Sequence, residues 1–374
     1  MSLKSLFELN NYWWILIWPF AAGGILSFLG CERTETVLGK KEVRWQPWAA
    51  FLLVLPLVLW AGCRGNFGDT YAYKSMFSGM PLKISGWESY LADVTKDKGF
   101  SVFGLVIKLI VGNYSAVFFT IIAAIQMGCL ASVLRKFSSN YWFSIFFFMA
   151  STDYVSWMFN GIRQFLAVTV IFAATALIVN KRFVPAIIVI LFASTFHQSA
   201  LLMLPIIFII QGKAFNKTSL LCIAGALLAL VFADQFTDLI DSLMSDTQYS
   251  NAVSEWESSG DDGMNPIRVL VYSVPTIIAL FGIRTIREED DPMINMCVNA
   301  SVITSCLGII AIGTSGISMG RLPVYTSLYS NCILLPWEID HVFKEQYAML
   351  VKVFAVVLYC VFFWFQMHNT WGVL

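Results

Sequence analysis

A group of charged and titratable side chains stands at or near the ends of long apolar segments, where charge is costly to place. They are Arg64, Asp69, Asp153, Arg163, His197, Arg268 and Arg321. A guanidinium group can hold two phosphate oxygens at once, and an aspartate or histidine can take a proton from a sugar hydroxyl. These residue types suit a site for a lipid-linked pyrophosphate that carries a sugar.

The elements that must position these residues are membrane helices. The chain has 374 residues, is 58% hydrophobic and is only 13% charged, which is more apolar surface than a soluble protein can bury. The alternating pattern of a transmembrane barrel does not recur, and the formal net charge of zero gives no indication of a nucleic-acid partner. We therefore expect an all-α, polytopic membrane bundle formed by one integral membrane domain, 1–374.

Apolar runs of about membrane length predict about twelve transmembrane helices. They lie near 13–29, 47–62, 114–134, 141–158, 161–179, 183–196, 199–211, 218–233, 266–284, 294–312, 323–337 and 349–368. Since no small-residue cleavage site follows the first run, we expect it to be a retained helix. The runs 183–196 and 199–211 are short, and lysines or arginines flank the pair on both sides. The positive-inside rule makes the pair a hairpin with the tip "TFHQSA" directed outward.

The same rule orients the rest of the chain. Loops that carry Lys and Arg are expected in the cytoplasm, and those poor in positive charge outside. The 63–112 loop then faces outward with an interfacial helix near 99–111, and the acidic 234–265 loop faces outward as well. An even number of helices places both termini outside.

The predicted orientation of the helices brings four arginines to one membrane depth, together with His197 and Asp153. They are Arg64, Arg163, Arg268 and Arg321. Asn160, Gln164 and Ala167 share the helical face of Arg163, which indicates a polar stripe facing a protein interior or a wet cavity. Other readings stay open for some of these residues. Arg268 is as well explained by an arginine that snorkels to lipid headgroups, His197 by a satisfied buried histidine, and the Asp69–Tyr73 pair by an ordered loop turn.

Neither a metal nor another cofactor is expected. The sequence has no Asp-rich metal motif, so the arginines would stabilise the leaving pyrophosphate in place of a cation. The eight cysteines are scattered singly and without a CxxC pattern, which is typical of packing residues rather than of disulfides or metal ligands.

Three short motifs resemble the EpsG family of Wzy-like bacterial polysaccharide polymerases. They are "CRGNFGDTYAYKSMF" with Arg64, Gly68, Asp69 and Tyr73, "NGIRQFLA" with Arg163, Gln164 and Ala167, and "FHQSALLMLP" with His197, Ser199, Ala200 and Pro205. Arg321 in "GRLPVY" also fits. The likeness covers most of the chain in order and spacing.

The resemblance implies a metal-independent glycosyltransferase of GT-C-like architecture in the bacterial cytoplasmic (inner) membrane, where it would be a multi-pass protein. Its substrates would be oligosaccharide repeat units of an O-antigen, capsule or exopolysaccharide, linked to undecaprenyl pyrophosphate. An acceptor hydroxyl would attack the anomeric carbon at the outer face of the membrane, and the lipid pyrophosphate would leave. A chain-length regulator and a flippase are the implied partners, besides the lipid bilayer.

We assign roles to the site residues on this basis. The catalytic candidates are His197, Asp69 and Arg163, and the substrate-binding candidates are Arg64, Tyr73, Asp153, Asn160, Gln164, Ser199, Arg268 and Arg321. Of the two candidate bases, we favour His197 over Asp69, because an ionised aspartate near bulk water is a weak base until it is desolvated.

Two other classes of membrane protein are compatible with an outward cationic cavity. A transporter or flippase for lipid-linked sugars would have internal repeats and access from both sides, whereas the polar residues here gather on one side only. An acyltransferase that modifies the polysaccharide would also use a histidine such as His197, but no carboxylate lies at a fixed short spacing from it.

Overall fold

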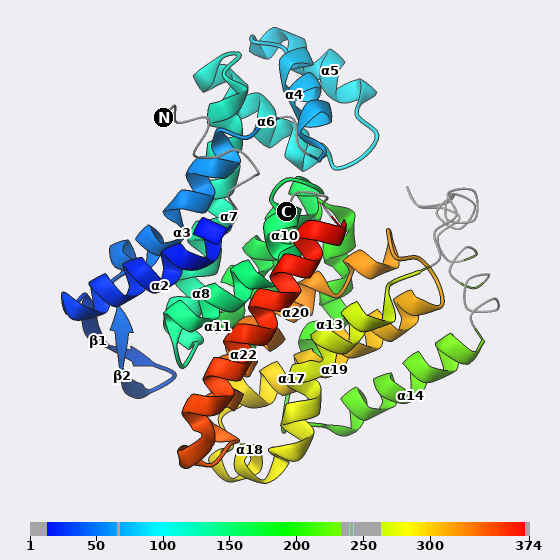
Figure 1. Cartoon of the computed structure of the whole chain (residues 1–374). Coiled ribbons are helices and arrows are strands. Elements are labelled where there is room, and N and C mark those ends of the chain that lie inside the picture. The colour runs from blue at the N-terminus through cyan, green and yellow to red at the C-terminus, as the bar shows by residue number, and fades with distance from the viewer. Residues whose placement is uncertain (1–12, 66–67, 233–238, 240–241, 243–262, 371–374) are drawn as a thin grey trace. The chain divides into compact units, whose positions relative to one another are not determined.

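The structure is a computed structural model that describes residues 13–65, 68–232, 239, 242 and 263–370 (Figure 1). The acidic 234–265 loop predicted from the sequence lies largely outside the described residues. The chain divides into two compact units, residues 1–202 with 349–374 (unit 1) and residues 203–348 (unit 2). Each unit is considered by itself.

Unit 1 contains most of the helices and the described strands. Its elements are α2 (Trp13–Phe28), β1 (Glu32–Val37), β2 (Lys40–Trp45), α3 (Pro47–Gly62), α4 (Thr70–Gly79), η2 (Ile84–Gly86), α5 (Trp87–Asp93), α6 (Lys98–Val111), α7 (Ser115–Phe137), α8 (Tyr141–Ala150), α9 (Asp153–Trp157), α10 (Ile162–Ala173), α11 (Thr175–Val179), α12 (Phe183–Ser194), η3 (Gln198–Leu202) and, apart from its first residues, α22 (Glu345–Phe365) with η6 (Gln366–Thr370). Helix α7 is central, because α3 and α10 both pack along it.

Unit 2 is built around one buried helix. Its elements are α13 (Met203–Ile209), α14 (Lys217–Val231), α17 (Pro266–Phe281), α18 (Ile283–Glu289), α19 (Pro292–Ile312), η4 (Met319–Arg321), α20 (Val324–Tyr329), the π-helical turn η5 (Ser330–Leu334) and α21 (Leu335–His341). Helix α19 packs against α14, α17 and α20 (Figure 1). Buried hydroxyl groups join these helices: Thr276 bonds Ser305 at 3.0 Å and Thr304 bonds Thr326 at 2.8 Å.

Each of the twelve apolar segments expected to be helical forms helix. The long runs do so because membrane-length apolar sequence has to satisfy its backbone hydrogen bonds internally. Within the described residues three helices, α7, α19 and α22 with the start of η6, are long and apolar enough to cross a membrane, or four if α17 and α18 form one span bent by 70°. The other apolar helices are shorter, so the number of crossings stays a prediction.

Two expected helices of unit 1 are interrupted, besides the bend between α17 and α18 in unit 2. The 141–158 run breaks between α8 and α9, where Thr152 adopts a positive φ of 52°. The 161–179 run breaks at Ala174, between α10 and α11. A β-branched residue at positive φ ends regular helix because its side chain crowds the backbone.

A β-hairpin corrects the all-α prediction. The stretch "ERTETVLGKKEVR" was expected to be a charged cytoplasmic loop, but together with Trp45 it forms antiparallel strands with Glu32 opposite Trp45 and Val37 opposite Lys40. Leu38 and Gly39 both have positive φ, 48° and 84°, which is the backbone of a tight hairpin turn. Glu35 anchors the hairpin to α7 through a two-pronged ion pair with Arg135, at 2.8 and 3.0 Å.

The 63–112 segment forms a small helical layer of α4, α5 and α6. The expected helix near 99–111 is α6. Lys108 of α6 is fully buried, and its ammonium donates to the carbonyl groups of Phe77, at 2.8 Å, and Ser78, at 3.3 Å, at the end of α4. A cation at the C-terminus of a helix satisfies its last carbonyl groups and its dipole. Lys108 therefore joins α4 to α6.

A turn is present at "TFHQSA", where the sequence predicted the tip of a hairpin, and the outward direction of this tip stays a prediction. Helix α12 ends at Ser194, and η3 begins at Gln198 and packs back against α12. His197 lies in this turn, which we name the 195–199 tip.

Candidate functional site

The head of α10 is fixed by Asp69 in a reciprocal pair of hydrogen bonds. The backbone N–H of Asp69 donates to Asn160 Oδ1 at 2.9 Å, and the N–H of Gly161 donates to Asp69 Oδ2 at 3.1 Å. Gly161 precedes α10 with a left-handed φ of 65°. Gly68 has a φ of 54°, and a Cβ there would lie 1.9 Å from Asn160 Oδ1. Only glycine permits this approach, so the first two sequence motifs meet here.

Arg163 is the cation next to this junction. Its Nη1 lies 2.9 Å from Asp97 Oδ2, and its Nε donates to the hydroxyl of Tyr73 at 3.4 Å. The Arg163 side chain is 35% exposed, whereas the Asp97 side chain is only 6% exposed. Arg163 therefore combines a fixed orientation with access from solvent, as a residue that binds an anion requires.

The 195–199 tip is attached to the same place through Asp97. The N–H of Gln198 donates to Asp97 Oδ1 at 3.3 Å, and the N–H of Gly99 donates to the carbonyl of Thr195 at 3.0 Å. In the tip itself, His197 Nδ1 lies 2.7 Å from Ser199 Oγ. All three sequence motifs thus meet around Asp97 and Arg163, the third through the Gln198 backbone N–H of the tip. We name the residues of this junction the Arg163 cluster: Asp69, Tyr73, Asp97, Asn160, Arg163, His197 and Ser199.

Burial shapes the electrostatics of the cluster. Burial raises the pKa of Asp97 above the usual range of an aspartate, and the Arg163 charge opposes this shift. Burial likewise raises the pKa of Tyr73, which keeps its phenol neutral and able to donate a hydrogen bond. The cluster therefore holds a cation, a carboxylate that is costly to ionise and a neutral hydroxyl side by side.

Asp97 is the cluster residue that the sequence interpretation missed. It directly precedes α6 and the apolar run "GFSVFGLVIKLIV", a position where an acidic residue often begins a helix. That signal marks a helix start, and nothing local in the sequence shows that the carboxylate contacts Arg163.

Arg64 occupies a different environment from Arg163. Its side chain is buried, its Nη1 donates to the Met158 carbonyl at 2.8 Å, and its Nε donates to the Ala61 carbonyl. The guanidinium also lies over the rings of Phe119 and Phe159, 4.4 and 4.5 Å from their centroids. Arg64 thus joins the end of α3 to the segment before α10.

The remaining predicted site residues lie elsewhere in their units. Asp153, the first residue of α9, and Gln164 in α10 are both buried in unit 1. Arg268 and Arg321 belong to unit 2, in the first turn of α17 and at the end of η4. The Met264 N–H donates to the Ala311 carbonyl at 2.8 Å and joins the segment just before α17 to the end of α19. The η4 turn, which contains Arg321, follows α19 in the sequence.

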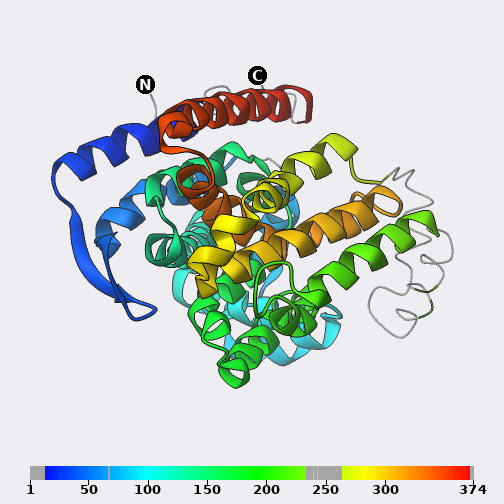
Figure 2. The ribbon, with the colours of Figure 1, turned by 90° about the horizontal axis from the view of Figure 1, so that it is seen from below.

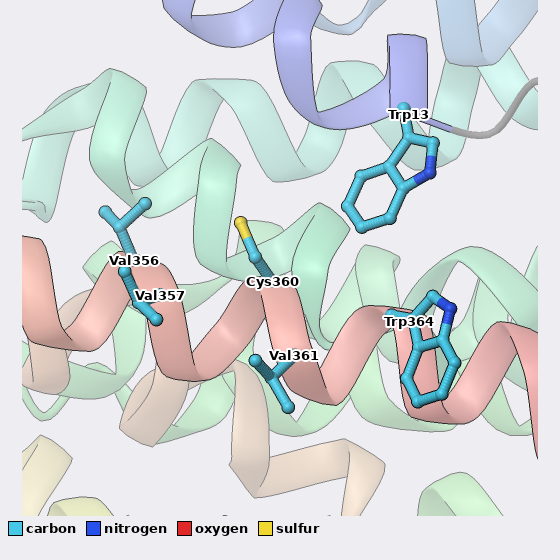
Figure 3. A pocket seen from close by; sticks show the side chains of 6 residues that line it. All are labelled: Trp13, Val356, Val357, Cys360, Val361 and Trp364. Atoms are coloured by element: carbon cyan, nitrogen blue, oxygen red, sulfur yellow. The ribbon is translucent and has the colours of Figure 1, made fainter.

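An apolar groove of about 350 Å³ lies between α2 and α22 in unit 1. Figure 2 shows these helices along one edge of the unit, and Trp13 packs on Phe363 with ring centroids 5.5 Å apart. The groove is lined by Trp13, Val356, Val357, Cys360, Val361 and Trp364. Trp13 and Trp364 lie at one end and Val356 and Val357 at the other (Figure 3).

A row of aromatic rings leads from this groove toward Arg64. Trp14, next to Trp13, meets Trp60 at 5.9 Å, and Trp60 meets Phe159 at 4.5 Å between ring centroids. Phe159 is one of the rings beneath the Arg64 guanidinium. Trp60 and Phe159 are buried, so the row is part of the core between α2 and the segment that precedes Arg163.

The described residues define a helical membrane protein whose polar cluster offers a partly exposed arginine side chain to an anion. A family model named EpsG family matches residues 48–372, and the chain therefore belongs to the EpsG family. Membership makes it a membrane protein of polysaccharide biosynthesis, with the character of a glycosyltransferase-like polymerase. Searches of curated proteins and of solved structures found no match.

Proposed function

We propose that this chain polymerises oligosaccharide repeat units linked to undecaprenyl pyrophosphate, as a multi-pass protein at the outer face of the bacterial cytoplasmic membrane. An acceptor hydroxyl of one repeat unit attacks the anomeric carbon of the growing chain, and lipid pyrophosphate leaves. A flippase supplies the repeat units and a chain-length regulator acts on the product.

The observation that carries this proposal is the Arg163 cluster. Arg163 is held by Asp97 and Tyr73 and is still 35% exposed, so its guanidinium can meet a pyrophosphate without first being ordered. A preorganised cation next to a leaving group stabilises the charge that develops on it. Family membership supports the sugar chemistry.

The structure suggests separate roles for the two arginines of the first two motifs. Arg163 binds the pyrophosphate. Arg64, enclosed by two rings and two carbonyl groups, acts as a positioning residue that holds the segment before α10. Asp69 also positions α10, because its carboxylate is bonded to the Gly161 N–H.

The groove between α2 and α22 suits the polyprenyl chain of the substrate. Its lining of valine side chains, tryptophan rings and Cys360 has no charged group. A long apolar polyprenyl chain gains free energy by burying its surface in such a groove.

The test is polymerisation by the purified chain in lipid vesicles, with undecaprenyl-pyrophosphate-linked repeat units. Wild type should give a ladder of products. Arg163→Lys should not, since an ammonium lacks the planar fork that grips two oxygens. Arg284→Lys, at an exposed position paired with Glu288, is the matched control and should behave as wild type. Transfer of the lipid-linked sugar across the vesicle membrane without any ladder would identify a transporter instead.

A further inference from the structure

Asp97 lies where three segments of unit 1 meet. Its Oδ2 contacts Arg163 of α10 at 2.9 Å, and its Oδ1 accepts the N–H of Gln198 from the 195–199 tip at 3.3 Å. Its own backbone begins α6. Both carboxylate oxygens are thus engaged, and the side chain is 6% exposed.

The backbone conformation of Asp97 is strained. Its φ is 53°, in the left-handed region that non-glycine residues rarely adopt. The following turn rests on the tip so closely that a Cβ at Gly99 would lie 2.8 Å from the Thr195 carbonyl oxygen. Such strain is kept where the surrounding structure over-determines it, and it is frequent at functional sites.

The charge state of Asp97 depends on Arg163. Arg163 from α10 contacts the carboxylate directly, Lys96 acts on it from its own segment, and Tyr73 from α4 shares Arg163. From the tip the carboxylate accepts the Gln198 N–H, and His197 and Ser199 are the neighbours of Gln198 in sequence. Among them Arg163 is the cation in direct contact. A buried carboxylate that loses such a partner becomes a stronger base, because desolvation disfavours its charge.

We propose that the substrate pyrophosphate displaces Asp97 from Arg163, and that Asp97 then accepts the proton of the attacking sugar hydroxyl. This inference rests on the proposed function. In the step, the hydroxyl O–H bond breaks and its proton goes to Asp97. The hydroxyl oxygen bonds to the anomeric carbon, and the bond from that carbon to the pyrophosphate oxygen breaks. The pyrophosphate leaves with the electron pair and is stabilised by Arg163.

This assignment differs from the base expected from the sequence. His197 has its Nδ1 directed to Ser199 Oγ at 2.7 Å, whereas Asp97 directly contacts the cation that binds the leaving group. In the proposed mechanism His197 and Ser199 contact the acceptor sugar. Substrate binding and activation of the base are thereby coupled, because the pyrophosphate that binds Arg163 frees the Asp97 carboxylate and is itself the leaving group.

The test combines binding and rate measurements on the full-length chain in vesicles. Undecaprenyl pyrophosphate without sugar is the binding probe. Asp97→Asn should bind it as well as wild type or up to about tenfold more tightly, because the competing anion is gone. With sugar-carrying substrate, kcat should fall by about 10²- to 10⁴-fold, and Asp97→Glu should restore part of it. Asp93→Asn, at an exposed position at the end of α5, is the matched control.

The pH dependence separates Asp97 from His197. The wild-type rate should fall as the pH drops through the pKa of the base, and His197→Gln should keep this acid limb. The proposal is overturned if His197→Gln loses this acid limb. It is also overturned if Asp97→Asn binds the probe more weakly than wild type or keeps a normal kcat, or if Asp97→Glu restores no activity. If wild type makes no polymer at all, the proposed function fails, while the binding comparison still tests the displacement.

Discussion

Arg163 and Asp97 form an ion pair of 2.9 Å between a partly exposed arginine side chain and a buried carboxylate. The pair joins the head of α10 to the start of α6, and through Gln198 to the 195–199 tip. An anion that reaches Arg163 from solvent therefore competes with Asp97, and the effect of that competition extends to the tip.

Arg64→Lys should damage stability rather than substrate binding. Lysine cannot reproduce both the contact with the two rings and the bonds to two carbonyl groups. A buried cation–π contact contributes about 2 kcal/mol, so thermal unfolding should occur at a clearly lower temperature. Once corrected for folded protein, the affinity for undecaprenyl pyrophosphate should stay at the wild-type level. A normal unfolding temperature with lost affinity would assign Arg64 to the substrate site.

Gly68→Ala should disrupt the junction between Asp69 and α10. The new Cβ would clash with Asn160 Oδ1, and alanine at a φ of 54° is strained by about 1–2 kcal/mol. Polymerisation should fall severely even where the protein folds, because the head of α10 carries Arg163. Gly65→Ala is the matched control, since no atom lies within 4 Å of its Cβ. Equal activity of the two variants would show that the junction does not position Arg163.

Glu35 should give the β-hairpin a pH-dependent attachment. The hydrogen-bonded Arg135 is the main cause that lowers the pKa of Glu35 from 4.5 to about 2. Since the folded-state pKa is depressed, the stabilisation is complete above the ordinary pKa and is lost as the pH falls from about 4.5 through 2. Because the pair is partly solvated, we expect it to contribute about 1 kcal/mol at neutral pH.

Unfolding of wild type and of Glu35→Gln at pH 7 and pH 3 measures this contribution. The variant should be less stable at pH 7, and the difference should shrink at pH 3. Glu32→Gln, at an exposed position in the same strand, should show neither effect. A constant difference between Glu35→Gln and wild type across this range would refute the linkage.

Cys360→Trp should fill the groove between α2 and α22. If the groove holds the polyprenyl chain, the KM for the undecaprenyl substrate should rise by about tenfold, equivalent to about 1.4 kcal/mol. A substrate with a short prenyl chain should be little affected. Leu358→Trp places the same ring at an exposed position on another face of α22, outside the groove lining, and it is the matched control. Similar changes for both variants would place the effect in the bilayer rather than in the groove.

The helices were predictable because apolar runs of membrane length satisfy their backbone hydrogen bonds only as helices. The interruption at Thr152 was not, because its positive φ depends on packing between α8 and α9. The β-hairpin was not predicted, because its lysine and arginine residues fit a cytoplasmic loop under the positive-inside rule. In addition, a short charged strand shows little alternation of apolar and polar residues. Its stabilisation comes from Arg135, which is distant in the sequence.

The site was predictable where one motif carried its own signal. Arg163 and His197 were recognised because a charge or an imidazole beside an apolar run is unusual. Asp97 was not recognised, because its partners are remote and it stands among other charged residues. Arg64 carries the same sequence signal as Arg163 but is enclosed by aromatic rings, which only the packing of α3, α7 and the segment before α10 reveals.

Lys108 links α4 and α6, because its buried ammonium bonds the last carbonyl groups of α4. Helix α4 begins directly after Asp69 and helix α6 directly after Asp97, and the Lys108 ammonium ties the far end of α4 to α6. A tilt of either helix must therefore carry the other with it. Asp69, which bonds the Gly161 N–H, and Asp97, which pairs with Arg163, therefore belong to one layer, so that a change in the tilt of this layer would disturb both contacts to the head of α10.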